Sequence, residues 1–133
     1  MLHKERNTLN NKYFERDESF LDDKLLPFVK WWGYIYIVVP GMKKDCHENI
    51  PKELLLSWTP EQLDYIHDVE YWRNIVLKSK QSEIISIYEM KNNEECWNDW
   101  IKCDNDYSRN DRKAIEAGAC KYLNFIAIVL RKK

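Results

Sequence analysis

The sequence predicts a single α/β (or α+β) domain, in which a small, largely parallel three-stranded sheet has helices on both faces. The chain has 133 residues, the size of one domain. Three apolar segments rich in β-branched and aromatic residues have the character of strands, and helical patterns separate them. Helical crossovers favour parallel strands, so we expect the order α-β-α-α-β-α-α-β. The main alternative is an antiparallel sheet with the third strand on the other edge.

The first predicted strand, residues 31–39, is aromatic and β-branched throughout. Residues 1–7 are expected to fray, and a mixed-charge helix after them ends before Pro27, since the residue preceding a proline avoids helical angles. Pro40 and Gly41 end the strand. Both faces of the strand are apolar near its end, so we expect a central strand that is buried on both sides.

The middle of the chain predicts two helices and a second strand. Pro51 suits the first turn of a short helix over residues 52–58. Thr59 and Gln62 flank Pro60 in the pattern of a capping box, which predicts a helix from there to about Lys78. Residues 83–89 alternate loosely and are rich in isoleucine, as expected of a strand.

The last third predicts two further helices and a closing strand, over residues 94–102, 109–122 and 123–130. On the first of these helices, Cys96, Trp100 and Cys103 share one face by their spacing of four and three. We assign that face to the core. Trp97 then points outward.

Composition and cysteine usage limit the possible functions. The formal net charge of −1 argues against a protein that binds polyanions over its whole surface. With no apolar targeting segment, we expect a cytoplasmic protein whose four cysteines are free thiols. The cysteines lack the paired spacing of a zinc site, and His67 has too few histidine partners in the sequence, so it is interpreted as a helix-surface residue. We therefore expect no metal site and no cofactor.

The favoured functional hypothesis is a non-catalytic protein-binding module, of the inhibitor or immunity type. It rests on an acidic, tryptophan-containing segment in a sequence that lacks an evident catalytic set of residues. Acids steer a basic partner, and an aromatic residue anchors it. The predicted contact residues are Glu94, Glu95, Trp97, Asp99, Asp104 and Asp106.

Two alternatives remain. Glu89 and Lys91 lie on the same side of the end of the second strand, where they could hold Mg²⁺ and polarise a phosphate. This pair resembles the E-x-K element of the restriction-endonuclease-like family and implies a magnesium-dependent nuclease. That family also needs an aspartate on a neighbouring strand, and none is suitably placed. The second alternative is nucleic-acid binding by the basic C-terminal segment, residues 109–133.

Overall fold

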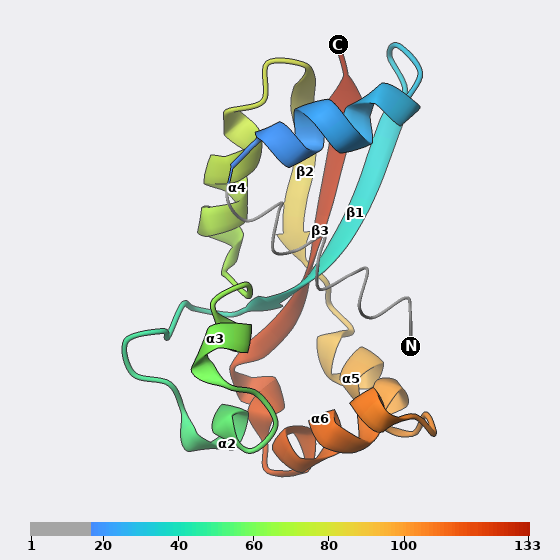
Figure 1. Cartoon of the computed structure of the whole chain (residues 1–133). Helices are drawn as coiled ribbons and strands as arrows, with labels where there is room; N and C mark the ends of the chain where they lie inside the picture. The colour runs from blue at the N-terminus through green and yellow to red at the C-terminus, as the bar shows by residue number, and fades with distance from the viewer. Residues whose placement is uncertain (1–16) are drawn as a thin grey trace.

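A computed structural model describes residues 17–133 as an α+β fold with a three-stranded sheet in the order β1-β3-β2 (Figure 1). The strands are β1 (Tyr34–Met42), β2 (Ser82–Glu89) and β3 (Leu123–Lys132). Both strand pairs are antiparallel, so the prediction of a largely parallel sheet is wrong. Residues 1–7 and most of the predicted N-terminal helix lie outside the described residues.

The connections explain the antiparallel sheet. β1 and β2 do run in the same direction, as a helical crossover implies, but β3 lies between them and runs oppositely. The helices that join β2 to β3 gather beyond one end of the sheet, at the bottom of Figure 1, so the chain re-enters the sheet at the end where it left. Two helices between strands therefore act as a long hairpin connection here.

The helices are short, and most lie near their predicted positions. In the described residues they are η1 (Leu21–Leu25), η2 (Leu26–Phe28), α2 (Lys52–Leu55), α3 (Pro60–Leu63), α4 (Val69–Leu77), α5 (Asn93–Ile101), α6 (Asp106–Glu116) and η3 (Ala119–Lys121). The capping box of Thr59 and Gln62 is confirmed. The predicted helix 60–78 is broken into α3 and α4, because Asp68 caps a new helix by accepting a hydrogen bond from Tyr71 N.

Two hydrophobic cores lie on opposite faces and at opposite ends of the sheet. On the first face, η1, η2 and α4 cover Val39, Ile126, Ile128 and Leu130 at the upper end. On the second face, the helices at the lower end pack on the alternate residues of β3, whose side chains point the other way, such as Leu123 and Phe125. The upper end of the second face is thus covered by neither hydrophobic core.

The first strand is an edge strand, which corrects the prediction that it is central and buried on both sides. Tyr34 and Tyr36 are exposed, while Ile35 and Ile37 pack against the first core. On β1 only its far end is deeply buried, at Val39 and Met42, whereas β3 is buried along its length, with Ile126, Ala127 and Ile128 fully buried. The central position belongs to the most apolar strand, and the sequence places that strand last.

None of the helices in the described part of the chain is long and apolar enough to cross a membrane. All four cysteines are free, as expected.

Candidate functional site

A patch of large side chains is exposed on the upper end of the second face of the sheet. We call it the open face and define it as Trp32, Tyr34, Tyr36, Val38 and Tyr88. Between 42% and 67% of the surface of each side chain is exposed. Folded domains rarely leave so many aromatic residues together in solvent, and contiguous apolar patches of this kind mark binding surfaces.

Trp32 holds a backbone conformation that is costly for a bulky residue. Its φ of 64° lies in the left-handed region, which side chains with a Cβ rarely adopt. Hydrogen bonds on either side hold the turn in place, from Trp32 N to Lys132 O and from Lys132 N to Gly33 O. Strained residues that persist in this way concentrate at functional sites.

Polar contacts tie the open face together across β3. The Tyr36 and Tyr88 hydroxyls are hydrogen-bonded, and this bond is the main reason that the pKa of Tyr36 is raised. Arg131 forms an ion pair with Glu83 and lies over the Trp32 ring, 5.7 Å from its centre. The cation of this face is therefore already partnered within the chain.

A cavity of about 220 Å³ lies where the open face meets the lower helices. Its walls include Pro40, Trp58, Trp97 and Tyr107. Its buried carboxylate, Asp111, accepts hydrogen bonds from Trp58 Nε1 at 3.1 Å and from Trp100 Nε1 at 2.8 Å. The cavity is thus aromatic in its walls and carries one buried acid, a combination that suits an apolar or cationic side chain.

The predicted acidic contact residues are exposed, but three of them are partnered within the chain. Asp104 and Asp106 both pair with Arg109, and Asp99 lies 3.7 Å from Lys102 Nζ. The exposed acids Glu94 and Glu95 lie in the first turn of α5, where they also complement the helix dipole. The negative charge of this segment is therefore smaller than its sequence implies.

The expectation that Trp97 points outward is wrong. Only 7% of its surface is exposed, and its ring stacks on Phe125 at a centroid distance of 5.0 Å. Cys103, assigned to the core, is exposed, and Trp100 is half-buried. The helix is rotated relative to the prediction because the widest apolar ring, rather than the two cysteines, packs against β3. Trp97 contributes to a binding surface only as a wall of the cavity.

The residues of the nuclease alternative do not form a metal-binding group. Glu89 Oε1 accepts a hydrogen bond from Asn124 Nδ2, a buried side chain at the end of β3. Lys91 lies beyond the end of β2, beside a cavity that it shares with Lys43 and Lys121. Within residues 17–133, the one group of three or more metal-ligating side chains is elsewhere, and it does not include Glu89.

Two of the last three cations of the basic C-terminal segment are committed to contacts within the chain, whereas Lys133 is exposed. Lys132 is buried, and its Nζ donates to Leu26 O at 2.9 Å and to Val29 O at 3.1 Å. Arg131 is paired with Glu83. These two side chains bind groups within the chain and are therefore poorly placed to contact a phosphate backbone.

Asp45, His47 and His67 form the group that could hold a metal ion, with donor atoms all within 4.8 Å of one another. His67 was expected on a helix surface, but it lies in the break between α3 and α4 and is 8% exposed. The sequence reading missed the group because its members are up to 22 positions apart. Cys46, between two of them, faces inward to Met42, and burial raises the pKa of its thiol, which disfavours a nucleophilic role.

The chain matches no known protein-family model, no curated protein and no solved structure. The function must therefore be inferred from the chemistry of these surfaces.

Proposed function

We propose that the protein is a non-catalytic protein-binding module and that the open face is the centre of its contact surface. The observation that carries the proposal is the exposure of Trp32, Tyr34, Tyr36 and Tyr88 on one side of a rigid sheet. Tyrosine and tryptophan dominate binding energy at protein interfaces because they bury a large area at a small cost in side-chain entropy. The cavity at the lower end of the face offers a pocket for a side chain of the partner.

A protein is favoured over a single-stranded nucleic acid as the partner. Exposed aromatic residues on a sheet can also stack on bases, but such surfaces need cations that are free to contact phosphates. On this face Arg131 is paired with Glu83, and Lys132 is buried behind it. The surface is thus rich in aromatic area and poor in available positive charge.

The narrower form of the proposal is an inhibitor or immunity-type module in the cytoplasm that blocks a basic partner surface. The exposed acids Glu94 and Glu95 support a basic partner, since carboxylates attract cations. Glu94 shares a cavity with Lys43, Lys91 and Lys121, and both carboxylate oxygens of Asp111 already accept hydrogen bonds within the chain. The four free thiols support a reducing compartment. In this form, the acids would steer association and the aromatic residues of the open face would hold the complex together.

The proposal is tested by quantitative affinity capture from a lysate of the source cells, with and without nuclease treatment. The informative variant is Tyr36→Ser combined with Tyr88→Ser. The matched control is Phe28→Ser, because Phe28 is 90% exposed and belongs to η2, away from the open face. Circular dichroism checks that all three proteins are folded.

We expect a protein that is retained by the wild type and the Phe28 variant and lost from the double variant. Equal retention by all three proteins would overturn the proposal. Loss of all retention after nuclease treatment would replace the protein partner with a nucleic acid. Sedimentation velocity on the pure chain identifies the remaining case, in which the partner is a second copy and the double variant shifts a dimer to a monomer.

A further inference from the structure

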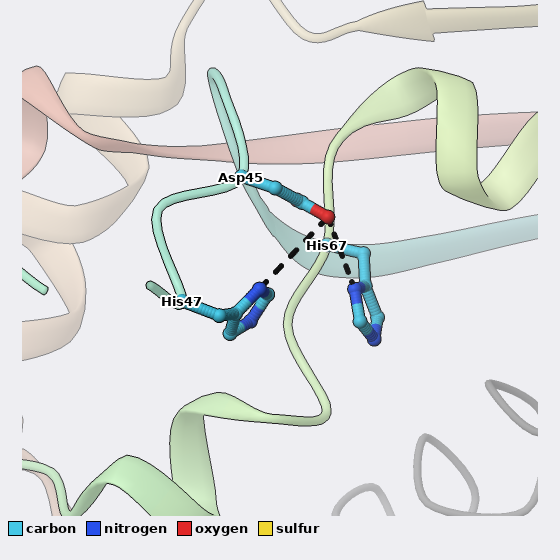
Figure 2. A group of neighbouring side chains, drawn as sticks. All are labelled: Asp45, His47 and His67. Atoms are coloured by element: carbon cyan, nitrogen blue, oxygen red, sulfur yellow. Dashed lines mark hydrogen bonds and ion pairs between the residues drawn. The ribbon is translucent and has the colours of Figure 1, made fainter. Parts of the chain in front are cut away.

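Three side chains from two loops converge at the lower end of the first face of the sheet, on the side opposite the open face. Asp45 and His47 come from the segment after β1, and His67 from the linker between α3 and α4 (Figure 2). The two loops are joined by their backbones as well, because Met42 N donates to His67 O at 3.0 Å and Asp68 N donates to Asp45 Oδ1 at 2.6 Å. The convergence is thus built into the fold.

The close approach of these loops requires a glycine. Gly41 forms a bridge with His67, and a Cβ at position 41 would lie 2.9 Å from the His67 carbonyl oxygen. The same Cβ would lie 2.4 Å from a methyl group of Ile126 and 2.6 Å from Asn124 Oδ1, so a side chain at position 41 would disturb β3 as well as the His67 loop. The position of His67 therefore depends on Gly41.

The donor atoms have a spacing that suits a metal ion. His67 Nδ1 lies 3.3 Å from Asp45 Oδ2, and His47 Nδ1 lies 3.9 Å from the same oxygen (Figure 2). Zinc bonds of about 2.0–2.1 Å in tetrahedral geometry place neighbouring donors roughly 3.3–3.4 Å apart. The first pair already has this separation, and the second needs only a small movement of a partly exposed ring.

The contacts around the donors hold them in a form ready to bind a cation. His47 Nε2 lies 2.8 Å from Leu63 O, and since a carbonyl only accepts, the Nε2–H must donate. A neutral His47 then turns the lone pair of its Nδ1 toward the Asp45 carboxylate. By the same argument, His67 Nδ1–H donates to Asp45 Oδ2 at 3.3 Å in the metal-free protein, and a bound metal ion would take the place of that proton. A histidine whose second nitrogen donates to a backbone carbonyl is the usual arrangement for a metal ligand.

The other two donors are also fixed in orientation. The His67 ring stacks on Tyr71 at a centroid distance of 3.6 Å, with 12° between the planes. The Asp45 carboxylate uses Oδ1 to accept from Asp68 N, so Oδ2 is the oxygen turned to the histidines. Preorganised donors of this kind lose little entropy on binding a metal.

From this geometry we propose that Asp45, His47 and His67 bind a divalent transition-metal ion, preferably zinc. Two imidazoles and one carboxylate suit Zn²⁺ or Fe²⁺, whereas Mg²⁺ and Ca²⁺ prefer oxygen ligands alone. Three protein ligands leave one tetrahedral position for water. Since His67 packs against Trp72 of the first core and His47 bonds to Leu63 of the second, the ion would tie the two cores together.

The test uses the full chain without a histidine tag, freed of metal by dialysis against a chelator and titrated with zinc chloride by calorimetry. We expect stoichiometric binding and a rise in the melting temperature, because zinc binds the folded state. Magnesium chloride should give neither effect. Cobalt(II) should give the visible bands of a tetrahedral site with nitrogen and oxygen ligands, without a thiolate charge-transfer band.

Two near-isosteric variants and two neighbours provide the controls. Asp45→Asn keeps an oxygen for Asp68 N, and His47→Gln keeps a donor for Leu63 O, so both should fold; each should weaken zinc binding by about tenfold or more. Cys46→Ser and Glu48→Gln should bind like the wild type. The proposal is wrong if zinc does not bind, if neither variant weakens binding, or if Cys46→Ser weakens it equally. None of these readouts involves a protein partner, so failure here leaves the proposed function intact.

Discussion

The two faces of the sheet differ sharply at its upper end, although the same three strands build both. On the first face, Ile126, Ile128 and Leu130 are fully buried beneath η1, η2 and α4. On the second face, Tyr36 and Tyr88 remain exposed. The sequence distinguishes the two by residue type, since the covered face is aliphatic and the open face carries the aromatic rings with polar groups.

The difference shows what holds the fold and what is available for binding. Aliphatic side chains contribute to stability when they are removed from water. The aromatic residues of the open face are exposed, so they contribute less hydrophobic free energy to folding. A partner that buries them would gain that free energy on binding. Substitutions of neighbouring residues on the two faces should therefore differ in their cost to stability.

Ile128→Ala should reduce the free energy of unfolding by about 2–5 kcal/mol, because it leaves a cavity in the first core. Its neighbour Val129 points to the other face and is only half-buried. Val129→Ala should cost about 1 kcal/mol or less. Urea denaturation of both variants measures the contrast, and equal losses would show that the second face is covered in solution.

Lys132→Met should cost about 1–3 kcal/mol, because it leaves Leu26 O and Val29 O without the hydrogen bonds that Lys132 Nζ donates. The adjacent Arg131→Met removes a partly exposed ion pair with Glu83 and should cost less than Lys132→Met. The same denaturation measurement checks this pair. A larger loss for Arg131 would mean that the open face contributes more to folding than its exposure implies.

Trp32→Gly should change the free energy of unfolding by less than about 1 kcal/mol. Removal of the left-handed strain gains about 1–2 kcal/mol, and the added chain entropy and the lost contact with Arg131 offset most of that gain. Trp31→Gly has no such strain to relieve, so it should destabilise more. If Trp32→Gly were the more damaging, Trp32 would be a structural residue rather than a binding residue.

Tyr88→Phe should lower the pKa of Tyr36, because the hydrogen bond with Tyr88 is the main cause of its rise. In the wild type the folded chain keeps this phenol proton to a higher pH than the unfolded chain. The associated stability is present below the ordinary tyrosine pKa and is lost as pH rises through the folded value. Ultraviolet titration of phenolate absorbance, with Tyr34→Phe as the control, measures the shift.

Local patterns in the sequence predicted most elements but not their pairing. The strand over 83–89, the helix starting near Glu94 and the capping box at Thr59 depend on neighbouring residues, and the structure confirms them. The direction of β3 depends on where α5 and α6 pack, which no local pattern encodes. The preference of helical crossovers for parallel strands correctly predicts that β1 and β2 run in the same direction. It does not predict that β3 lies between them and runs in the opposite direction.

The candidate sites illustrate the same limit. The aromatic residues of β1 are evident in the sequence. They are predicted to be buried, because apolar residues on both faces usually indicate a central strand, but several of them are exposed in the structure. The rotation of α5 depends on the fit of Trp97 against Phe125, which is a tertiary contact. Asp45 and His67 are 22 positions apart and meet through tertiary contacts between two loops, one of which is the close approach at Gly41.

The position of β3 between β1 and β2 has a consequence for the order of events during synthesis. Both edge strands leave the ribosome before β3, the strand with which each of them pairs in the sheet. Until β3 emerges, β1 and β2 present unpaired backbone groups and their aromatic side chains to solvent or to chaperones. Pairing of Tyr34 with Arg131 then closes a loop across most of the chain, so the final assembly should be slow and should occur in a single late step.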